Sequence, residues 1–146
     1  MYQRILVPVD GSESAARGLR EAIALATVTG ALLRIIYVVD EVAHTASAQE
    51  VLDSALAMCR RRGAHAQTHL YQNLGGAAAE TIIEDARKWG AQLIVMGTHG
   101  RRGITRAVLG SDAEAVVRRS PVPVLLVRYT QIGRSGVNLS AAADSM

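Results

Sequence analysis

The sequence is poor in the features that define several protein classes. It has one cysteine, Cys59, among 146 residues, which excludes a disulfide framework and a zinc site built from cysteines. No apolar run approaches the roughly 18 residues of a membrane-spanning helix. The first residues lead directly into a strand-like apolar run at 5–9, rather than into the hydrophobic core of a signal peptide. We therefore expect a cytoplasmic protein.

Aromatic residues and lysine are also scarce. Phenylalanine is absent, aromatic residues make up 3% of the chain, and Lys88 is the one lysine among 16 basic residues. Proteins that bind single-stranded nucleic acid combine a basic groove with stacking aromatic side chains. A net charge of +3 without such side chains gives no reason to expect a nucleic-acid partner. The arginine triplet at 60–62 is more simply interpreted as the positively charged end of a helix.

What the chain does have is the composition of one globular domain. Hydrophobic residues make up 49% and charged residues 20% of the sequence, and a chain of this length buries about two thirds of its surface on folding. The composition changes near residue 129, beyond which glycine, serine and alanine dominate without a periodic apolar pattern. We predict a domain over residues 1–128 and a flexible C-terminal tail over residues 129–146.

Short apolar runs alternate with helical patterns along the domain. Such alternation is typical of β-α-β units on a parallel sheet. Cys59 falls on the apolar face of one predicted helix, where a thiol packs as a small hydrophobic group. The predicted strands are 5–9, 32–39, 66–71 (an edge strand), 92–96 and 122–127. The predicted helices have an apolar face over 15–26, a capping box at 47–50, a span of 77–89 and a second capping box at 111–114.

Right-handed crossovers turn this order into a doubly wound, five-stranded parallel sheet with helices on both faces. Ligands of such folds bind beyond the carboxyl ends of the strands, where the strand order reverses. Three segments then come into question, namely 8–12, 37–40 and the residues that follow Met96.

The connection over 97–110 is longer than the 2 to 6 residues usual between a strand and a helix. Its glycines let the backbone approach a ligand closely, and it ends at a helix start, which attracts anions. These features favour a phosphate site, but simpler interpretations stay open. Ser111 is also explained as a helix cap, Asp10 as part of a turn, and His99 as a loop residue. The connection contains Gly97, Gly100, Gly103 and Gly110, with Arg101, Arg102 and Arg106.

The pattern Gly97-x2-Gly100-x9-Gly110-Ser111 resembles the nucleotide-binding signature of the universal stress protein family. Residues 5–12, 96–100 and 120–127 resemble other segments of that family, and the resemblance covers residues 2–128. It implies the family's ATP-binding branch and a Rossmann-like fold, of the adenine nucleotide alpha hydrolase type, with strand order 3-2-1-4-5.

The resemblance also implies roles for individual residues. Gly97, Gly100, Gly110 and Ser111 would hold the phosphates, Val38 would read the adenine edge through its main chain, and Asp10 would accept a ribose hydroxyl. ATP would bind with Mg²⁺ or Mn²⁺, with unknown metal ligands on the protein. The complete set of candidate nucleotide-binding residues is Pro8, Val9, Asp10, Val38, Met96, Gly97, His99, Gly100, Arg101, Arg102, Gly103, Gly110, Ser111 and Asp112.

Two functions fit this reading. The first is an ATP-binding module for stress response or signalling with little or no catalysis, and the alternative is a slow ATP hydrolase that acts as a molecular switch. A hydrolase needs a positioned base and water, and Asp10, Asp40 and His99 are the candidates near the strand ends. They form no recognisable catalytic pair in the sequence, so no catalytic residue is assigned.

Three related classes are excluded by missing residues. A phospho-receiver domain needs a lysine after its last strand, whereas Lys88 lies in a predicted helix. A P-loop enzyme needs Gly-x4-Gly-Lys-Ser/Thr, which is absent. The turn 10–12 lacks the three glycines of a dinucleotide site.

The last apolar run predicts a self-interaction. The family resemblance places residues 122–127 at a sheet edge, where an apolar strand is an aggregation hazard unless something covers it. We expect a homodimer in which this strand pairs with its copy, with the missing N–H of Pro123 turned away from the new ladder.

Overall fold

The computed structural model describes residues 1–99 and 109–128. The sheet of this region contains β1 (Arg4–Val9), β2 (Leu32–Val39), β3 (His65–Gln72), β4 (Leu93–Gly97) and β5 (Val124–Val127). The connecting helices are α1 (Glu13–Thr29), η1 (Val42–His44, a 3-10 turn), α2 (Thr45–Arg61), α3 (Ala78–Trp89) and α4 (Ser111–Arg119).

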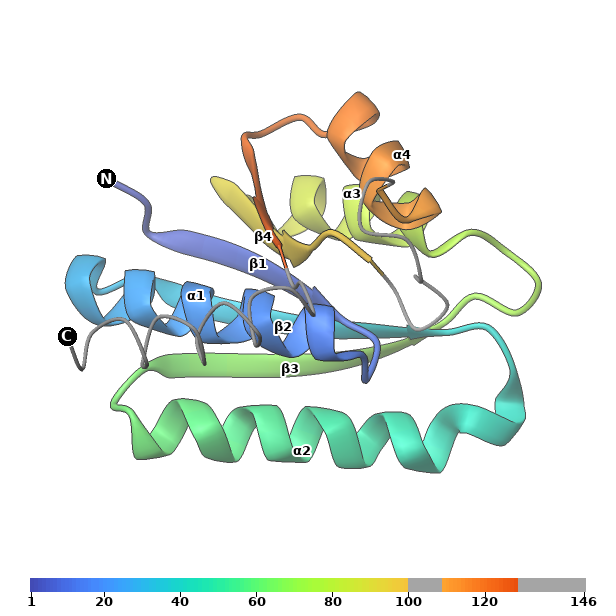
Figure 1. Ribbon diagram of the computed structural model, residues 1–146, viewed down its shortest axis with the longest axis horizontal. Helices are drawn as coiled ribbons and strands as arrows, with labels where there is room; N and C mark the ends of the chain where they lie inside the picture. Colours follow the sequence, from blue (N-terminus) through green and yellow to red (C-terminus); the bar gives the residue numbers. More distant parts are fainter. Residues whose placement is uncertain (100–108, 129–146) are drawn as a thin grey trace, which may run out of the picture.

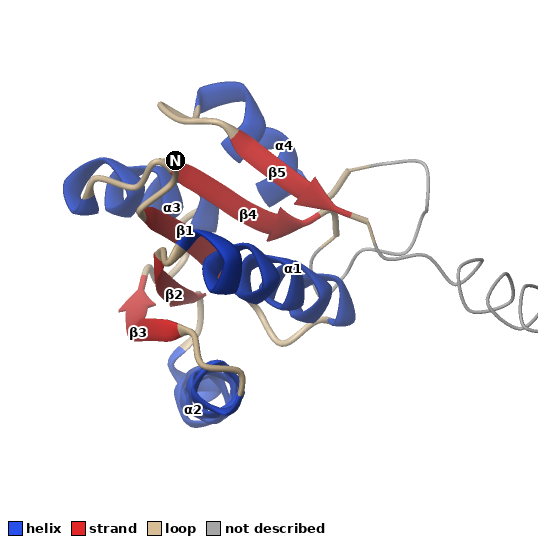
Figure 2. Ribbon diagram, turned by 90° about the vertical axis from the view of Figure 1, so that its left-hand side faces the viewer, coloured by secondary structure: helices blue, strands red, loops and turns tan. Residues whose placement is uncertain are grey.

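All strand pairs are parallel, and the spatial order is β3-β2-β1-β4-β5. The predicted fold class and strand order are confirmed, as is the edge position of β3. Helices α1 and α2 cover one face of the sheet, and α3 and α4 cover the other (Figures 1 and 2). Successive side chains of β1 alternate between the two cores, because strand side chains point to opposite faces: Ile5 packs with the α1 side and Leu6 with the α3 side.

Caps fix the start of α1 and the end of α3. The Ser12 hydroxyl accepts a hydrogen bond from the Ala15 amide at 3.1 Å and caps α1. Gly90 ends α3 in the left-handed conformation at φ 78°, which glycine adopts without steric cost. Cys59 is fully buried on the inner face of α2, so it packs as predicted.

Both predicted capping boxes are wrong. Helix α2 begins at Thr45 because η1 runs directly into it, and the Ser47 hydroxyl donates instead to the carbonyl of His44 at 3.0 Å. Helix α4 begins at Ser111 itself, with Gly110 in the N-cap position and no side-chain cap. The N-cap is therefore three residues earlier than predicted in α2 and one residue earlier in α4.

Strand β5 is shorter than predicted. It starts at Val124 because Pro123 has no N–H for a ladder and the preceding residues form a turn. In that turn the Ser120 hydroxyl accepts from the Val122 amide at 3.1 Å. The carbonyl of Pro123 still accepts from the Ile94 amide at 3.0 Å, which fixes the start of β5 beside β4.

A polar network fastens α3 to the sheet. Arg34, on β2, forms two hydrogen bonds with the carboxylate of Asp85, at 2.8 and 2.9 Å, and Tyr71 of β3 donates to the same carboxylate. Asp85 is 4% exposed, so its charge is matched by a bidentate partner at the position where it is desolvated. This contact holds the later part of α3 against β2 and β3.

No helix in the described part of the chain is long and apolar enough to cross a membrane.

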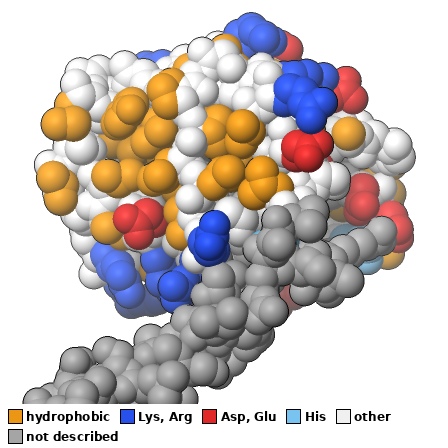
Figure 3. All heavy atoms as spheres, turned by 45° about the horizontal axis from the view of Figure 1, so that its top comes forward, with side chains coloured by type: hydrophobic (Ala, Val, Ile, Leu, Met, Phe, Trp, Pro, Cys, Tyr) orange, Lys and Arg blue, Asp and Glu red, His pale blue; other side chains and the backbone are white. Residues whose placement is uncertain are grey.

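Strand β5 lies at the edge of the sheet with β4 on one side, and its side chains are only partly covered. Leu125 is 38% exposed and Val117 of α4 is 46% exposed. Figure 3, which brings the top of Figure 1 forward, shows a broad group of hydrophobic side chains on this side of the molecule. An apolar edge strand of this kind is compatible with the expected homodimer, which stays a prediction.

We predict that the chain forms a dimer of twice 15.5 kDa through β5, since a second copy would satisfy the free edge. Light scattering at tens of micromolar measures the mass directly. Leu125→Lys should shift the mass toward the monomer, whereas Val28→Lys, at an exposed position on α1, should not. A wild-type monomer at that concentration would contradict the prediction.

Candidate functional site: a pocket at the carboxyl ends of the strands

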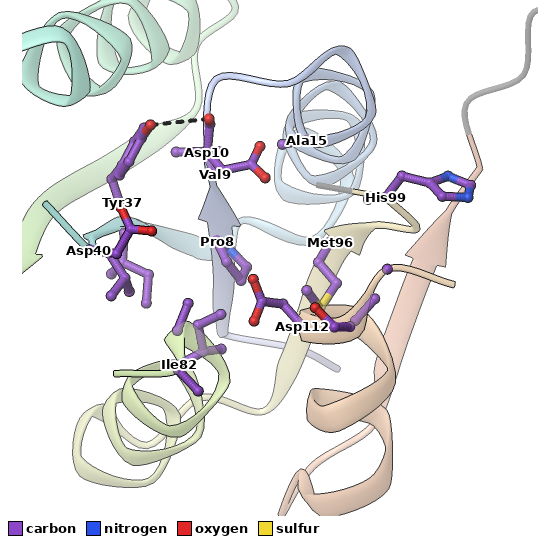
Figure 4. Close-up of a pocket in the computed structure, with 18 of the residues that line it drawn as sticks. Pro8, Val9, Asp10, Ala15, Tyr37, Asp40, Ile82, Met96, His99 and Asp112 are labelled. Atoms are coloured by element: carbon purple, nitrogen blue, oxygen red, sulfur yellow. Dashed lines mark hydrogen bonds between the residues drawn. The ribbon is translucent and has the colours of Figure 1, made fainter. Parts of the chain in front are cut away.

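A pocket of about 770 Å³ opens where β1, β2 and β4 end and α3 and α4 begin (Figure 4). Its volume lies within the range of small-molecule sites. All ten candidate residues that the structure describes line it, namely Pro8, Val9, Asp10, Val38, Met96, Gly97, His99, Gly110, Ser111 and Asp112. Gly100, Arg101, Arg102 and Gly103 lie outside the described residues.

The pocket sits at the switch point of the sheet. Strand β1 pairs with β2 along all six residues but aligns with β4 only at Ile5 and Leu6. Pro8, further along β1, has no N–H to donate to a ladder. The chain crosses from β1 to β2 in one direction and reaches β4 in the other, so the helices that follow these strands diverge and leave a crevice.

The turn after β1 forms one wall. The carboxylate of Asp10 accepts a hydrogen bond from the Ser12 amide at 3.0 Å, and the Tyr37 hydroxyl donates to the Asp10 carbonyl at 3.1 Å. Gly11 has a φ of 83°, which suits a residue without a Cβ. The turn interpretation of Asp10 is therefore correct, and the residue also faces the pocket (Figure 4).

Gly97 is needed for packing. A Cβ atom at this position would lie 2.5 Å from the carbonyl carbon of Ser14 on α1. A Cβ at Gly18, one turn further along α1, would lie 3.1 Å from the Gly97 amide nitrogen. The first glycine of the signature thus lets α1 approach the end of β4, which is a structural explanation independent of any ligand.

The two ends of the 97–110 connection are tied together. The Gly110 amide donates to the carbonyl of Thr98 at 2.7 Å, and the Thr98 amide donates to the carbonyl of Val127 at 3.2 Å. The His99 amide donates to the hydroxyl of Ser14 at 3.1 Å. These contacts fix the start of α4 beside the ends of β4 and β5.

The start of α4 faces the pocket with free backbone donors of the first turn. No side chain among residues 1–99 and 109–128 caps this helix, and Gly110 has ordinary extended angles of φ −63° and ψ 155°. Side-chain size at position 110 therefore matters for access rather than for backbone strain. The first amides of an uncapped helix and its dipole form a favourable place for an anion.

Asp112 is the second residue of α4, and its carboxylate points into the pocket (Figure 4). Partial burial against the pocket wall raises the pKa of its carboxyl, and the negative charges of Asp10 and Asp40 raise it further. A hydrogen bond from the backbone of Ala79, at the start of α3, acts in the opposite direction. The residue therefore links the starts of α3 and α4 while facing two other carboxylates.

Several lining residues are not among the candidate nucleotide-binding residues. Tyr37 and Asp40 belong to the segment 37–40, which the sequence does point to because it lies at the end of β2. His44 comes from the unexpected turn η1, and its Nδ1 atom lies 3.7 Å from the Asp40 carboxylate. Ile82 and its neighbours come from α3, whose position depends on the Arg34–Asp85 contact, and no sequence motif marks it.

The carboxylates do not amount to a metal site by themselves. Among residues 1–99 and 109–128, no three His, Cys, Asp or Glu side chains are placed to hold a metal ion together.

We predict that Gly97→Ala lowers the free energy of unfolding by about 1–3 kcal/mol or more. This is the usual cost of forcing an extra methyl group into a packed site. Chemical denaturation measures this loss. Ser54→Thr is the control, because it adds one methyl group at an exposed position on α2. A stable Gly97→Ala variant would show that α1 does not need this close approach.

Asp112→Asn should raise the melting temperature at pH 7. A raised carboxyl pKa means that the folded state disfavours the ionised form, so stability falls as the pH rises through that pKa. The gain of the variant should shrink as the pH falls toward and below the ordinary carboxyl value of 3.8. Thermal melts between pH 3 and pH 8 test this, with Glu114→Gln on the same helix as control. An increase in melting temperature that does not change with pH would contradict the raised pKa of Asp112.

Comparisons with known proteins agree with this geometry. The model of the universal stress protein family matches residues 1–128. Universal stress protein MJ0531 of Methanocaldococcus jannaschii is 33% identical over 88% of this chain and 83% of its own length. A solved universal stress protein in complex with cAMP is 30% identical, with a TM-score of 0.73 over 87% of this chain and 97% of that one.

A third relative is the universal stress protein from Archaeoglobus fulgidus in complex with dAMP. It is 26% identical, with a TM-score of 0.71 over 86% of this chain and 98% of that one. Sequence signature, strand order and family match point the same way, and the chain belongs to the universal stress protein family.

Proposed function

We propose that this chain binds an adenine nucleotide, ATP together with Mg²⁺ or Mn²⁺, in the pocket at the carboxyl ends of the strands. It would act in the cytoplasm as a nucleotide-dependent module for stress response or signalling, with little or no catalysis. The observation that carries the proposal is the meeting of the switch-point pocket with the uncapped start of α4.

The adenosine end of the ligand fits between the first two strands. Val38 is half-buried near the end of β2 and lines the pocket, so its main chain is placed to read the adenine edge. Asp10 faces the same space, and its carboxylate suits a ribose hydroxyl. Two relatives of similar fold are solved with cAMP and with dAMP, which supports an adenine ligand here.

The phosphate end fits at α4. Gly110 and Ser111 line the pocket at the first turn of the helix, where backbone amides and the helix dipole favour anions. The Ser111 hydroxyl is not used as a cap, which leaves it available to donate to a phosphate oxygen. Mg²⁺ and Mn²⁺ take oxygen ligands, and ATP phosphates would supply most of them.

The test compares ATP with adenosine on Ser111→Ala. Loss of one hydrogen bond to a charged phosphate costs about 1.5–3 kcal/mol, so ATP affinity should fall about tenfold or more. Adenosine should bind the variant as it binds the wild type, because it has no phosphate. Calorimetric titration of ligand-free protein with each ligand, with Mg²⁺ present for ATP, measures both affinities.

Ser47→Ala, an exposed serine on α2 outside the pocket, is the matched control and should change neither affinity. No binding of ATP or adenosine to the wild type would reject an adenine nucleotide site. Equal losses for the two ligands would place the phosphates elsewhere. Phosphate release measured in the same samples separates a binding module from a slow hydrolase.

A further inference from the structure

The second residue of α4 lies beside the position proposed for the phosphates. Asp112 directly follows Ser111, lines the same pocket, and turns its carboxylate toward the centre of the space in Figure 4. An acidic residue in the first turn of a helix is ordinarily explained by the helix dipole. Glu114, on the same turn, fits that explanation because it pairs with Arg118 at 3.3 Å outside the pocket.

Asp112 differs from Glu114 in what surrounds it. Its carboxylate faces those of Asp10 and Asp40 across the pocket and meets the backbone of Ala79 at the start of α3. The described lining contains these three carboxylates and no lysine or arginine. His44 and His99 are its basic side chains, and the Nδ1 atom of His44 already faces Asp40.

The charge of this wall opposes an anionic ligand. A phosphate held at the first amides of α4 would lie next to the Asp112 carboxylate, and like charges at such separations repel strongly where water is partly excluded. Burial, followed by the charge of Asp10, raises the pKa of the Asp112 carboxyl, which agrees with a position where negative charge is disfavoured. Removal of the carboxylate therefore ought to favour a ligand in proportion to the ligand's negative charge.

We propose that Asp112 is a specificity-determining residue that selects against uncompensated phosphate charge in this pocket. The inference rests on the proposed function, since it assumes an adenine ligand with its phosphates at α4. It deepens that function by naming the ligand class: nucleotides with a low negative charge, or polyphosphates whose charge a divalent cation neutralises.

The test measures how much Asp112→Asn improves binding for ligands of increasing charge. Calorimetric titrations at low salt use adenosine, cAMP, Mg²⁺-ATP, and ATP with a chelator. The improvement should be absent for adenosine, small for cAMP and Mg²⁺-ATP, and about tenfold or more for metal-free ATP. Near 1 M salt the improvement for metal-free ATP should largely disappear, because the screening length falls to about 3 Å.

Glu114→Gln is the matched control, since it removes one negative charge from the same helix turn outside the pocket. It should leave the ratio of ATP to adenosine affinity nearly unchanged. Asp112→Ser provides a second charge-free variant and should reproduce the ligand ranking if Asp112→Asn is poorly folded. Thermal melts of all variants check folding.

Three results would overturn the inference while leaving nucleotide binding intact. They are an equal change for adenosine and ATP, no change for either, and a loss of ATP affinity in the charge-free variants. The last of these would show that Asp112 contributes a favourable contact or holds the cation. If the wild type binds none of the four ligands, the proposed function itself fails and the inference falls with it.

Discussion

The position of the pocket depends on one close contact between backbones. Helix α1 lies so near the end of β4 that a Cβ on Gly97 would meet the backbone of Ser14, and a Cβ on Gly18 would approach the Gly97 amide. Ser14 is buried there, and its hydroxyl accepts from the His99 amide. The chain that leaves β4 is thereby held against α1. This contact sets the position from which the chain continues toward α4.

Main-chain hydrogen bonds connect the end of β4 to β5 and to the start of α4. Thr98 donates to Val127 at the end of β5 and accepts from Gly110 before α4. Thr98 and Gly110 are thus close in space even though they are 12 residues apart in numbering. On the opposite wall, the Arg34–Asp85 contact holds α3. The pocket lies between α3 and the start of α4, which are held by different contacts.

The sequence predicts this fold well because strands buried on both faces must be almost wholly apolar. β1, β2 and β4 show that pattern, and the strand order follows from the family signature. Helix starts were less predictable. Ser47 and Ser111 are residue types that favour caps. However, η1 runs into α2, so that α2 begins before Ser47, and Gly110 takes the N-cap position of α4. Only coordinates distinguish these alternatives.

The candidate site was predictable where it follows strand ends and not where it depends on tertiary packing. The residues after β1 and β4 were identified because parallel strands end at one edge of the sheet. His44 and Ile82 enter the pocket through η1 and the placement of α3, which leave no local pattern. Gly97 was assigned to phosphates, yet its contact with Ser14 already requires a glycine. Packing of α1 against β4 thus explains this glycine of the signature without a ligand.

The electrostatics of the pocket combine two opposing elements. The starts of α3 and α4 each present a dipole equivalent to roughly half a positive charge, whereas Asp10, Asp40 and Asp112 each carry a full negative charge when ionised. The carboxylates of the described lining therefore add negative charge beside the helix starts that would hold an anion. In the proposed complex, the start of α4 would hydrogen-bond the phosphate oxygens, while a cation would supply positive charge. Positioning the phosphates and compensating their charge would therefore be separate requirements. The backbone at the start of α4 would meet the first, and a cation the second.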